Sequence, residues 1–166
     1  RSGSTMHAGA IAQNTAFEMR AVCDLDPERQ QQATQRFGCK VYSDYHAMLR
    51  QESLDLVTIV TRSDQHCVMT CDCLTAGVPV LVTKPWAVNT TEAERMIAAS
   101  QSTGKRLFPW LPARWGCILR RLRELIAAGS IGKVFQIRRA VTSFGTRCDW
   151  QTEKRYGGGY LLNWGP

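Results

Sequence analysis

The chain has 166 residues, of which 44% are hydrophobic and 21% are charged. This length allows one full domain, or one domain with part of a second, and the composition excludes wholesale disorder. No apolar run approaches the roughly 20 residues that a membrane helix needs, and the residues after Arg1 lack the pattern of a signal peptide. Because the chain begins with Arg1 rather than Met, we expect further residues upstream.

The net charge of +7 is distributed unevenly along the chain. Residues 1–104 hold 9 Lys and Arg against 11 Asp and Glu, a net charge of −2, whereas residues 105–166 hold 12 against 3, a net charge of +9. Such a change indicates a domain boundary, or a face that meets an anionic partner. We therefore expect one domain over residues 1–110 and the start of a second over residues 111–166.

Seven cysteines raise the hypotheses of a disulfide scaffold and of a metal site. Cys67, Cys71 and Cys73 lie beside His66, but their spacing contains no Cys-x-x-Cys, and on a helix Cys73 points away from the other two. An odd number of cysteines, several within apolar runs, is typical of reduced, buried thiols. We expect no metal and a cytoplasmic protein.

Short β-rich runs and helix-like segments alternate over the first two thirds of the chain. The predicted strands are residues 19–23, 40–42, 55–60, 78–82 and 106–108, and the predicted helices are residues 6–14, 27–37, 44–50, 64–76 and 91–103. Asp26 and Pro27 are typical of a helix start, and Thr91 with Glu94 matches a capping box. The alternation predicts an α/β fold with a doubly wound, Rossmann-type parallel sheet.

After Pro109 the pattern changes. An amphipathic helix is predicted over residues 118–128, and a long, half-exposed strand over residues 133–144. A polar loop then leads to the three glycines of residues 157–159. These features predict the start of a second, α+β domain.

Two residues at the predicted sheet edge indicate a nucleotide site. Open parallel sheets bind ligands at the carboxyl ends of their strands, and dinucleotide folds carry G-x-G-x-x-G there, with an acid about 20 residues later that binds the ribose. Gly3 precedes the first helix, and Asp24 follows 21 residues later at a strand end. The alternative, which this context makes the weaker one, is that Gly3 is an ordinary glycine at a helix start. If it is the third glycine, the central strand lies upstream of Arg1, and strands 19–23 and 55–60 should not pair directly.

Lys84 follows the predicted strand of residues 78–82 and precedes Pro85. Its ammonium group should therefore emerge at the carboxyl edge of the sheet, where a lysine can hold a hydroxyl or carbonyl oxygen and relay a proton. The alternative is a solvated lysine at a strand end. Residues 61–66, after the preceding buried strand, are the other candidates at this edge.

Several segments together resemble one known family. They are AVCDLDPER, the VTIVT strand with the following SDQH, VPVLVTKP and GGGYLLNWG. The chain resembles the Gfo/Idh/MocA family of NAD(P)-dependent oxidoreductases over essentially its whole length. The resemblance implies an N-terminal Rossmann domain, a C-terminal α/β domain whose sheet mediates homo-oligomers, and hydride transfer to or from a sugar, polyol or related hydroxy or carbonyl compound.

The resemblance also implies roles for individual residues. Gly3 matches the last fingerprint glycine, and Asp24 matches the ribose-binding acid, which favours NAD over NADP as cofactor. Thr61, Ser63 and His66 match the loop beside the nicotinamide ribose. Lys84 and Pro85 match the family's Lys-Pro pair, which contacts substrate and nicotinamide and is often joined by a cis peptide bond. Arg114 and Trp115 match the interdomain linker, and Asn163 matches an Asp of the second catalytic motif.

The departures from the family's pattern leave alternatives open. Thr83 replaces the Glu before the Lys-Pro pair, Arg62 replaces a Pro, and the chain ends at Pro166 where the catalytic His is expected next. We therefore expect an internal fragment that is inactive alone, and a catalytically impaired, cofactor-binding relative is the alternative function. A nucleic-acid-binding module is a third hypothesis for the basic tail, but the tail lacks interleaved aromatic residues. We expect a small-molecule substrate and neither a nucleic-acid nor a membrane partner.

Overall fold

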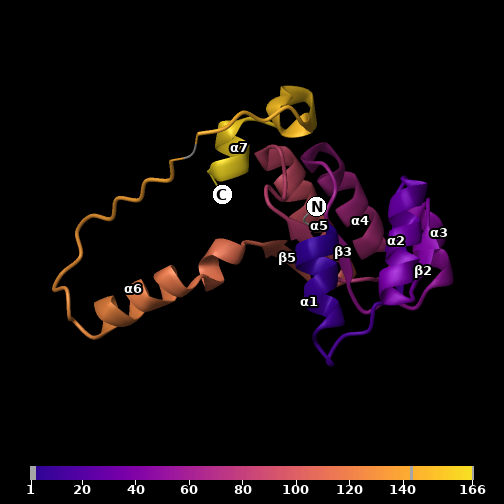
Figure 1. Cartoon of the computed structure of the whole chain (residues 1–166), viewed down its shortest axis with the longest axis horizontal. Coiled ribbons are helices and arrows are strands. Elements are labelled where there is room, and N and C mark those ends of the chain that lie inside the picture. Colours follow the sequence, from indigo (N-terminus) through magenta and orange to yellow (C-terminus); the bar gives the residue numbers. More distant parts are fainter. Residues whose placement is uncertain (1–2, 143, 166) are drawn as a thin grey trace.

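The computed structural model describes residues 3–142 and 144–165 (Figure 1). The strands are β1 (Ala21–Cys23), β2 (Lys40–Tyr42), β3 (Val57–Ile59), β4 (Val80–Thr83) and β5 (Leu107–Trp110). The α-helices are α1 (Ala8–Ala12), which continues a π-helical turn (Gly3–His7), α2 (Pro27–Phe37), α3 (Tyr45–Gln51), α4 (His66–Thr75), α5 (Thr90–Thr103), α6 (Cys117–Ala127) and α7 (Tyr160–Trp164). Short 3-10 helices span Ser63–Gln65, Pro112–Trp115, Trp150–Thr152 and Lys154–Tyr156.

The strands form two parallel sheets, β1-β2 and β3-β4-β5. Val57, Thr58 and Ile59 of β3 pair with residues 80–82 of β4, which in turn pairs with β5. The predicted α/β class with parallel pairing is confirmed. The prediction that β1 and β3 do not pair with each other is also confirmed, because each belongs to a separate sheet.

Helix ends follow local capping chemistry. The carboxylate of Asp26 accepts a hydrogen bond from the Glu28 amide at 3.0 Å, and Gly38 ends α2 at φ +65°, as predicted. The predicted capping box at Thr91 is wrong. Asn89 caps α5 by accepting from the Glu92 amide at 2.8 Å, because Asn89 is extended whereas Thr91 is already helical.

The core lies between the β3-β4-β5 sheet and helices α4 and α5. Its buried members are Ile59, Cys67, Cys73, Leu74, Val80, Val82 and Met96. Burial raises the pKa of the Cys73 thiol to about 12 and that of Cys67 to about 11, so these thiols are protonated near neutral pH. All seven cysteines are free, but Cys117 and Cys148 are exposed, which corrects the expectation of uniformly buried thiols.

The region after β5 differs from the prediction. Helix α6 forms, but none of its residues is buried, and Ile118 is 83% exposed. The predicted strand over residues 133–144 is wrong: the described residues of that range, all but residue 143, form no regular element. A strand needs a hydrogen-bonding partner, and no described strand pairs with this segment. Figure 1 shows α6 leading away from the sheets and this segment running back, apart from them, toward α7.

Among the described residues, no helix has the length and apolar character needed to cross a membrane.

Candidate active site

The candidate site lies at the carboxyl edge of the β3-β4-β5 sheet. β3 and β4 run parallel in register, so the segments that follow them, residues 60–66 and residues 84–89, emerge at the same edge. The C-terminal residues 149–164, which we call the docked segment, return to this edge. The 3-10 helix Lys154–Tyr156 contacts the 3-10 helix Ser63–Gln65.

Lys84 and Asn163, the two residues predicted to be catalytic, are in direct contact. The Lys84 Nζ donates to the main-chain oxygen of Asn163 and, at 2.9 Å, to its side-chain Oδ1. Lys84 is partly buried, and desolvation, followed by the nearby positive charge of Arg147, lowers the pKa of its amino group. The Lys84–Pro85 peptide is cis, as the resemblance implied. The structure thus joins β4 to α7 across 79 residues of sequence.

His66 connects the two loops that follow β3 and β4. Its side chain is nearly fully buried, and its Nδ1 lies 2.9 Å from the Pro85 oxygen while its Nε2 lies 3.2 Å from the Thr61 oxygen. Burial lowers the pKa of the imidazole, against the opposing effect of the two carbonyls. Both ring nitrogens face main-chain oxygens. A neutral ring has one N–H, so it donates to one of these oxygens and packs against the other, and it links the loops that carry Thr61 and Pro85.

Ser63 and Thr83 are also buried beneath the site. The Thr83 hydroxyl donates to the Ile59 main-chain oxygen at 3.2 Å, so it braces neighbouring strands. The Ser63 Oγ has no hydrogen-bond partner in the described structure. Thr61 is exposed, with its hydroxyl 3.6 Å from the Met69 sulfur.

Asp24 follows β1, at the carboxyl end of the other sheet. Its Oδ1 accepts from the Asp26 amide at 3.0 Å, its Oδ2 lies 3.5 Å from an Arg29 nitrogen, and its side chain remains 31% exposed. A partly exposed carboxylate with free lone pairs suits the hydroxyls of a ribose. Gly3 lies against Val60, and a Cβ there would meet Val60 at an ordinary 3.7 Å, so packing alone does not require glycine at this position.

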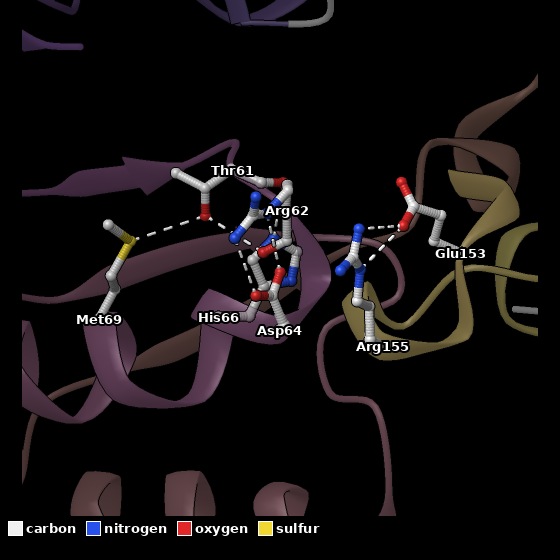
Figure 2. Close-up of polar contacts among 7 residues, drawn as sticks. All are labelled: Thr61, Arg62, Asp64, His66, Met69, Glu153 and Arg155. Carbon is white, nitrogen blue, oxygen red and sulfur yellow. Dashed lines mark hydrogen bonds and ion pairs between the residues drawn. The ribbon is translucent and has the colours of Figure 1, made fainter. Parts of the chain in front are cut away.

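Among the described residues, contacts of three kinds hold the docked segment against the sheet edge: cation–π contacts, a close backbone approach and hydrogen bonds. One cation–π contact joins Lys84 Nζ to the Trp164 ring, whose centre lies 5.8 Å away. The Tyr156 ring lies 4.0 Å from the Arg62 guanidinium carbon. A Cβ on Gly157 would lie 2.5 Å from Val88 Cγ1 and 2.9 Å from Ser63 Cβ, so the backbone approaches more closely than any side chain permits. The hydrogen bonds between Lys84 and Asn163 are the third kind. Figure 2 shows the Arg62–Asp64 pair facing the Arg155–Glu153 pair of the docked segment.

Sequence reasoning included Arg62 only as part of the candidate loop of residues 61–66, and it did not select Tyr156. No spacing rule connects two positions so far apart, and only the departure at Arg62 marked it as unusual. The linker residues Arg114 and Trp115 are exposed and lie in the 3-10 helix that follows β5. Within residues 3–142 and 144–165, no group of three or more His, Cys, Asp or Glu side chains is arranged to hold a metal ion.

Comparison with known proteins shows the family of this chain. Residues 2–110 match the Gfo/Idh/MocA group, described as the oxidoreductase family with an NAD-binding Rossmann fold. The chain belongs to this oxidoreductase family. The chain is 34% identical to the D-apiose dehydrogenase of Paraburkholderia graminis, and the aligned region covers 80% of this chain and 36% of that protein.

Two crystal structures extend the family comparison. An NAD-binding protein from Listeria innocua superposes with a TM-score of 0.91 at 28% identity, covering 99% of this chain and 49% of that one. The WlbA dehydrogenase from Bordetella pertussis, solved with NADH and UDP-GlcNAcA, superposes with a TM-score of 0.74 at 30% identity. This superposition covers 81% of this chain and 39% of that one. The chain thus spans less than half the length of these Gfo/Idh/MocA relatives.

Proposed function

We propose that the protein is an NAD(P)-dependent oxidoreductase that transfers a hydride between a nicotinamide cofactor and a sugar, polyol or related hydroxy or carbonyl compound. The observation that carries the proposal is the contact of Lys84 with Asn163 at the carboxyl edge of a Rossmann-type sheet. Membership of the Gfo/Idh/MocA family and the substrate named for the apiose dehydrogenase support the reaction class and the substrate class.

Lys84 is the residue that handles the proton in this proposal. As an amine, its Nζ accepts the proton of a substrate hydroxyl, and as an ammonium it donates that proton to a carbonyl oxygen. Partial burial lowers the pKa of the Lys84 amino group, which makes the neutral form more accessible near neutral pH. Asn163 exchanges no proton, but its two oxygens hold the direction in which Nζ points.

The residues around the sheet edge fit a nicotinamide dinucleotide, which when bound would supply the hydride donor or acceptor. The Asp24 carboxylate would accept hydrogen bonds from the ribose hydroxyls next to the adenine and would repel a phosphate there, which favours NAD over NADP. Thr61, held by His66, and Pro85 would line the nicotinamide end together with Lys84. Ser63 and His66 would act beneath this surface by supporting it.

The Thr83 hydroxyl favours a second candidate function, a cofactor-binding relative without dehydrogenase activity. Thr83 stands where the family carries Glu, and its hydroxyl is committed to Ile59 in the buried sheet. It therefore places no carboxylate beside Lys84, and Asn163 supplies an amide in place of an acid. Such a protein would bind the dinucleotide and leave the hydride in place.

Nuclear magnetic resonance of the isotopically labelled chain tests the binding step, since it detects millimolar affinities. NAD⁺ is expected to shift amide resonances of residues following β1, β3 and β4. Asp24→Ala should weaken this binding about tenfold or more, because a charged hydrogen-bond acceptor contributes about 1.5–3 kcal/mol. Asp55→Ala, an exposed carboxylate before β3, is the matched control and should change nothing. No shift in these loops at millimolar NAD⁺ would overturn cofactor binding.

Turnover distinguishes the two candidates. The whole protein is incubated with NAD⁺ and a panel of polyols and aldoses, and reduced nicotinamide is followed by its absorbance. The oxidoreductase should reduce NAD⁺ with at least one of them, and Lys84→Met should abolish this reduction while NAD⁺ still binds. Binding without turnover across the panel would favour the second candidate.

A further inference from the structure

The position of the docked segment depends on few contacts. Residues 133–142 form no regular element, and α6 buries none of its residues, so the chain leading into the segment does not fix it. Figure 1 shows this stretch running well away from the sheets before the segment returns. The placement of Asn163 on Lys84 must therefore be set where residues 149–164 meet the sheet edge.

Arg62 provides a preorganised surface at this meeting point. Its Nε lies 3.2 Å from Asp64 Oδ1 and its Nη2 lies 3.1 Å from Oδ2, a two-bond arrangement that fixes the guanidinium plane. The Tyr156 ring lies over that guanidinium at 4.0 Å, within the range of a cation–π contact. Since Arg62 belongs to the loop after β3 and Tyr156 to the docked segment, this contact bridges the two.

A second arginine near the same ring makes no bridge. The Arg155 guanidinium carbon lies 4.6 Å from the Tyr156 ring centre, and its Nε donates to Glu153 Oε2 at 2.8 Å. Arg155, Glu153 and Tyr156 all belong to the docked segment, and Figure 2 shows Arg155 paired with Glu153. The two arginines thus have the same charge, the same ring and a similar carboxylate partner, but only Arg62 connects the segment to the sheet.

Gly157, next to Tyr156, couples the position of the Tyr156 ring to that of α7. Gly157 follows Tyr156 directly, has a φ of +71°, and lies too close to Val88 and Ser63 to carry a Cβ. With the ring on Arg62 and the next residue seated on Ser63, the backbone enters α7 in one position. Asn163, on the second turn of α7, then faces the Lys84 amino group.

We propose that Arg62 is a positioning residue that, through the Tyr156 ring, seats residues 149–164 so that Asn163 holds the Lys84 amino group. The consequence of this positioning for catalysis rests on the proposed function, whereas the positioning itself does not depend on that function. Among the described residues, Lys84 lies near Arg147 and Asn163, and its Nζ lies 5.8 Å from the centre of the Trp164 ring. All three belong to the C-terminal part of the chain, so unseating this part leaves Lys84 more solvated.

The test measures the exposure and titration of Lys84 without any cofactor. The full 166-residue chain is labelled with acetic anhydride over a range of pH, and labelling of each lysine is quantified by mass spectrometry, with the exposed Lys105 and Lys133 as internal references. In Arg62→Ala and Tyr156→Leu, the limiting labelling rate of Lys84 should rise about threefold or more, and the midpoint of its pH profile should move up toward those of the references. Amide hydrogen exchange in α7 should accelerate in the same two variants.

Two matched variants separate positioning from general loss of stability. Arg155→Ala removes the same charge beside the same ring, and Tyr156→Phe keeps the ring, so both should retain wild-type labelling of Lys84 within about twofold. The inference is overturned if Arg62→Ala leaves Lys84 labelling unchanged, or if Arg155→Ala raises it as much as Arg62→Ala does. An Arg62-dependent effect in a protein that binds no NAD⁺ would support this inference and defeat the proposed function.

Discussion

Mild acid should destabilise the fold through His66. The imidazole is buried, and burial lowers its pKa in the folded chain, whereas the unfolded chain restores the ordinary value of about 6.5. The unfolded state then binds more protons below about pH 6.5, so the stabilisation is complete above that pH and is lost as the pH falls toward the folded value. A ring that stays neutral when folded accounts for at most about 1.3 kcal/mol of lost stability between about pH 7 and about pH 5.5.

Urea unfolding of the wild type and of His66→Gln at both pH values measures this contribution. The variant should lose about 1–3 kcal/mol at neutral pH, because it leaves a buried carbonyl of Thr61 or Pro85 without its donor. Its further loss on acidification should be smaller than the wild type's by about 1 kcal/mol. His46→Gln, at a ring that is half exposed, is the control and should follow the wild type. Equal acid sensitivity of the wild type and His66→Gln would refute the reasoning.

Three further outcomes are expected. Gly157→Ala should accelerate limited proteolysis of the docked segment, because a Cβ there clashes with Val88 and Ser63. Gly129→Ala, at a similar φ of +68° but with nothing within 4 Å, should add only about 1 kcal/mol of backbone strain and leave the cleavage pattern unchanged. Equal cleavage of the two variants would contradict the packing argument. In the native chain, a thiol reagent should modify the exposed Cys117 quickly and the buried Cys73 only after unfolding, which mass spectrometry detects. Asp26→Ala should lower the free energy of unfolding by about 1 kcal/mol in urea titrations, and a loss below a few tenths would mean that the cap is dispensable.

Local chemistry determined the regular elements of residues 3–110. Helix α2 begins after Asp26 and ends at Gly38 as the sequence predicts, because capping and a left-handed glycine act within a few residues. The β-branched run within residues 55–60 contains β3 for the same kind of reason. The misplaced start of α5 shows the limit of such rules, since Asn89 and Thr91 both offer a capping pattern and only the backbone conformation selects one.

The strand predicted over residues 133–144 failed for a different reason. Its alternating pattern is local, but a strand is stabilised by the partner that it pairs with, and no strand in the described chain pairs with this segment.

The two residues predicted to be catalytic were found by different kinds of evidence. Lys84 could be placed at the sheet edge from sequence because a strand end and a following proline determine it locally, and the family resemblance supplied Asn163 as a candidate.

The sequence by itself therefore determined the fold class and, over residues 3–110, the order of the strands and helices. Only the tertiary structure decided that Asn163 lies on Lys84, that His66 turns both ring nitrogens toward main-chain oxygens, and that Tyr156 rests on Arg62. The physical reason is the range of the interactions. Caps and hydrophobic periodicity act over a few residues. The contacts of His66 with Pro85, of Lys84 with Asn163 and of Arg62 with Tyr156 join positions 19 to 94 residues apart, which come together only after the sheet edge has formed.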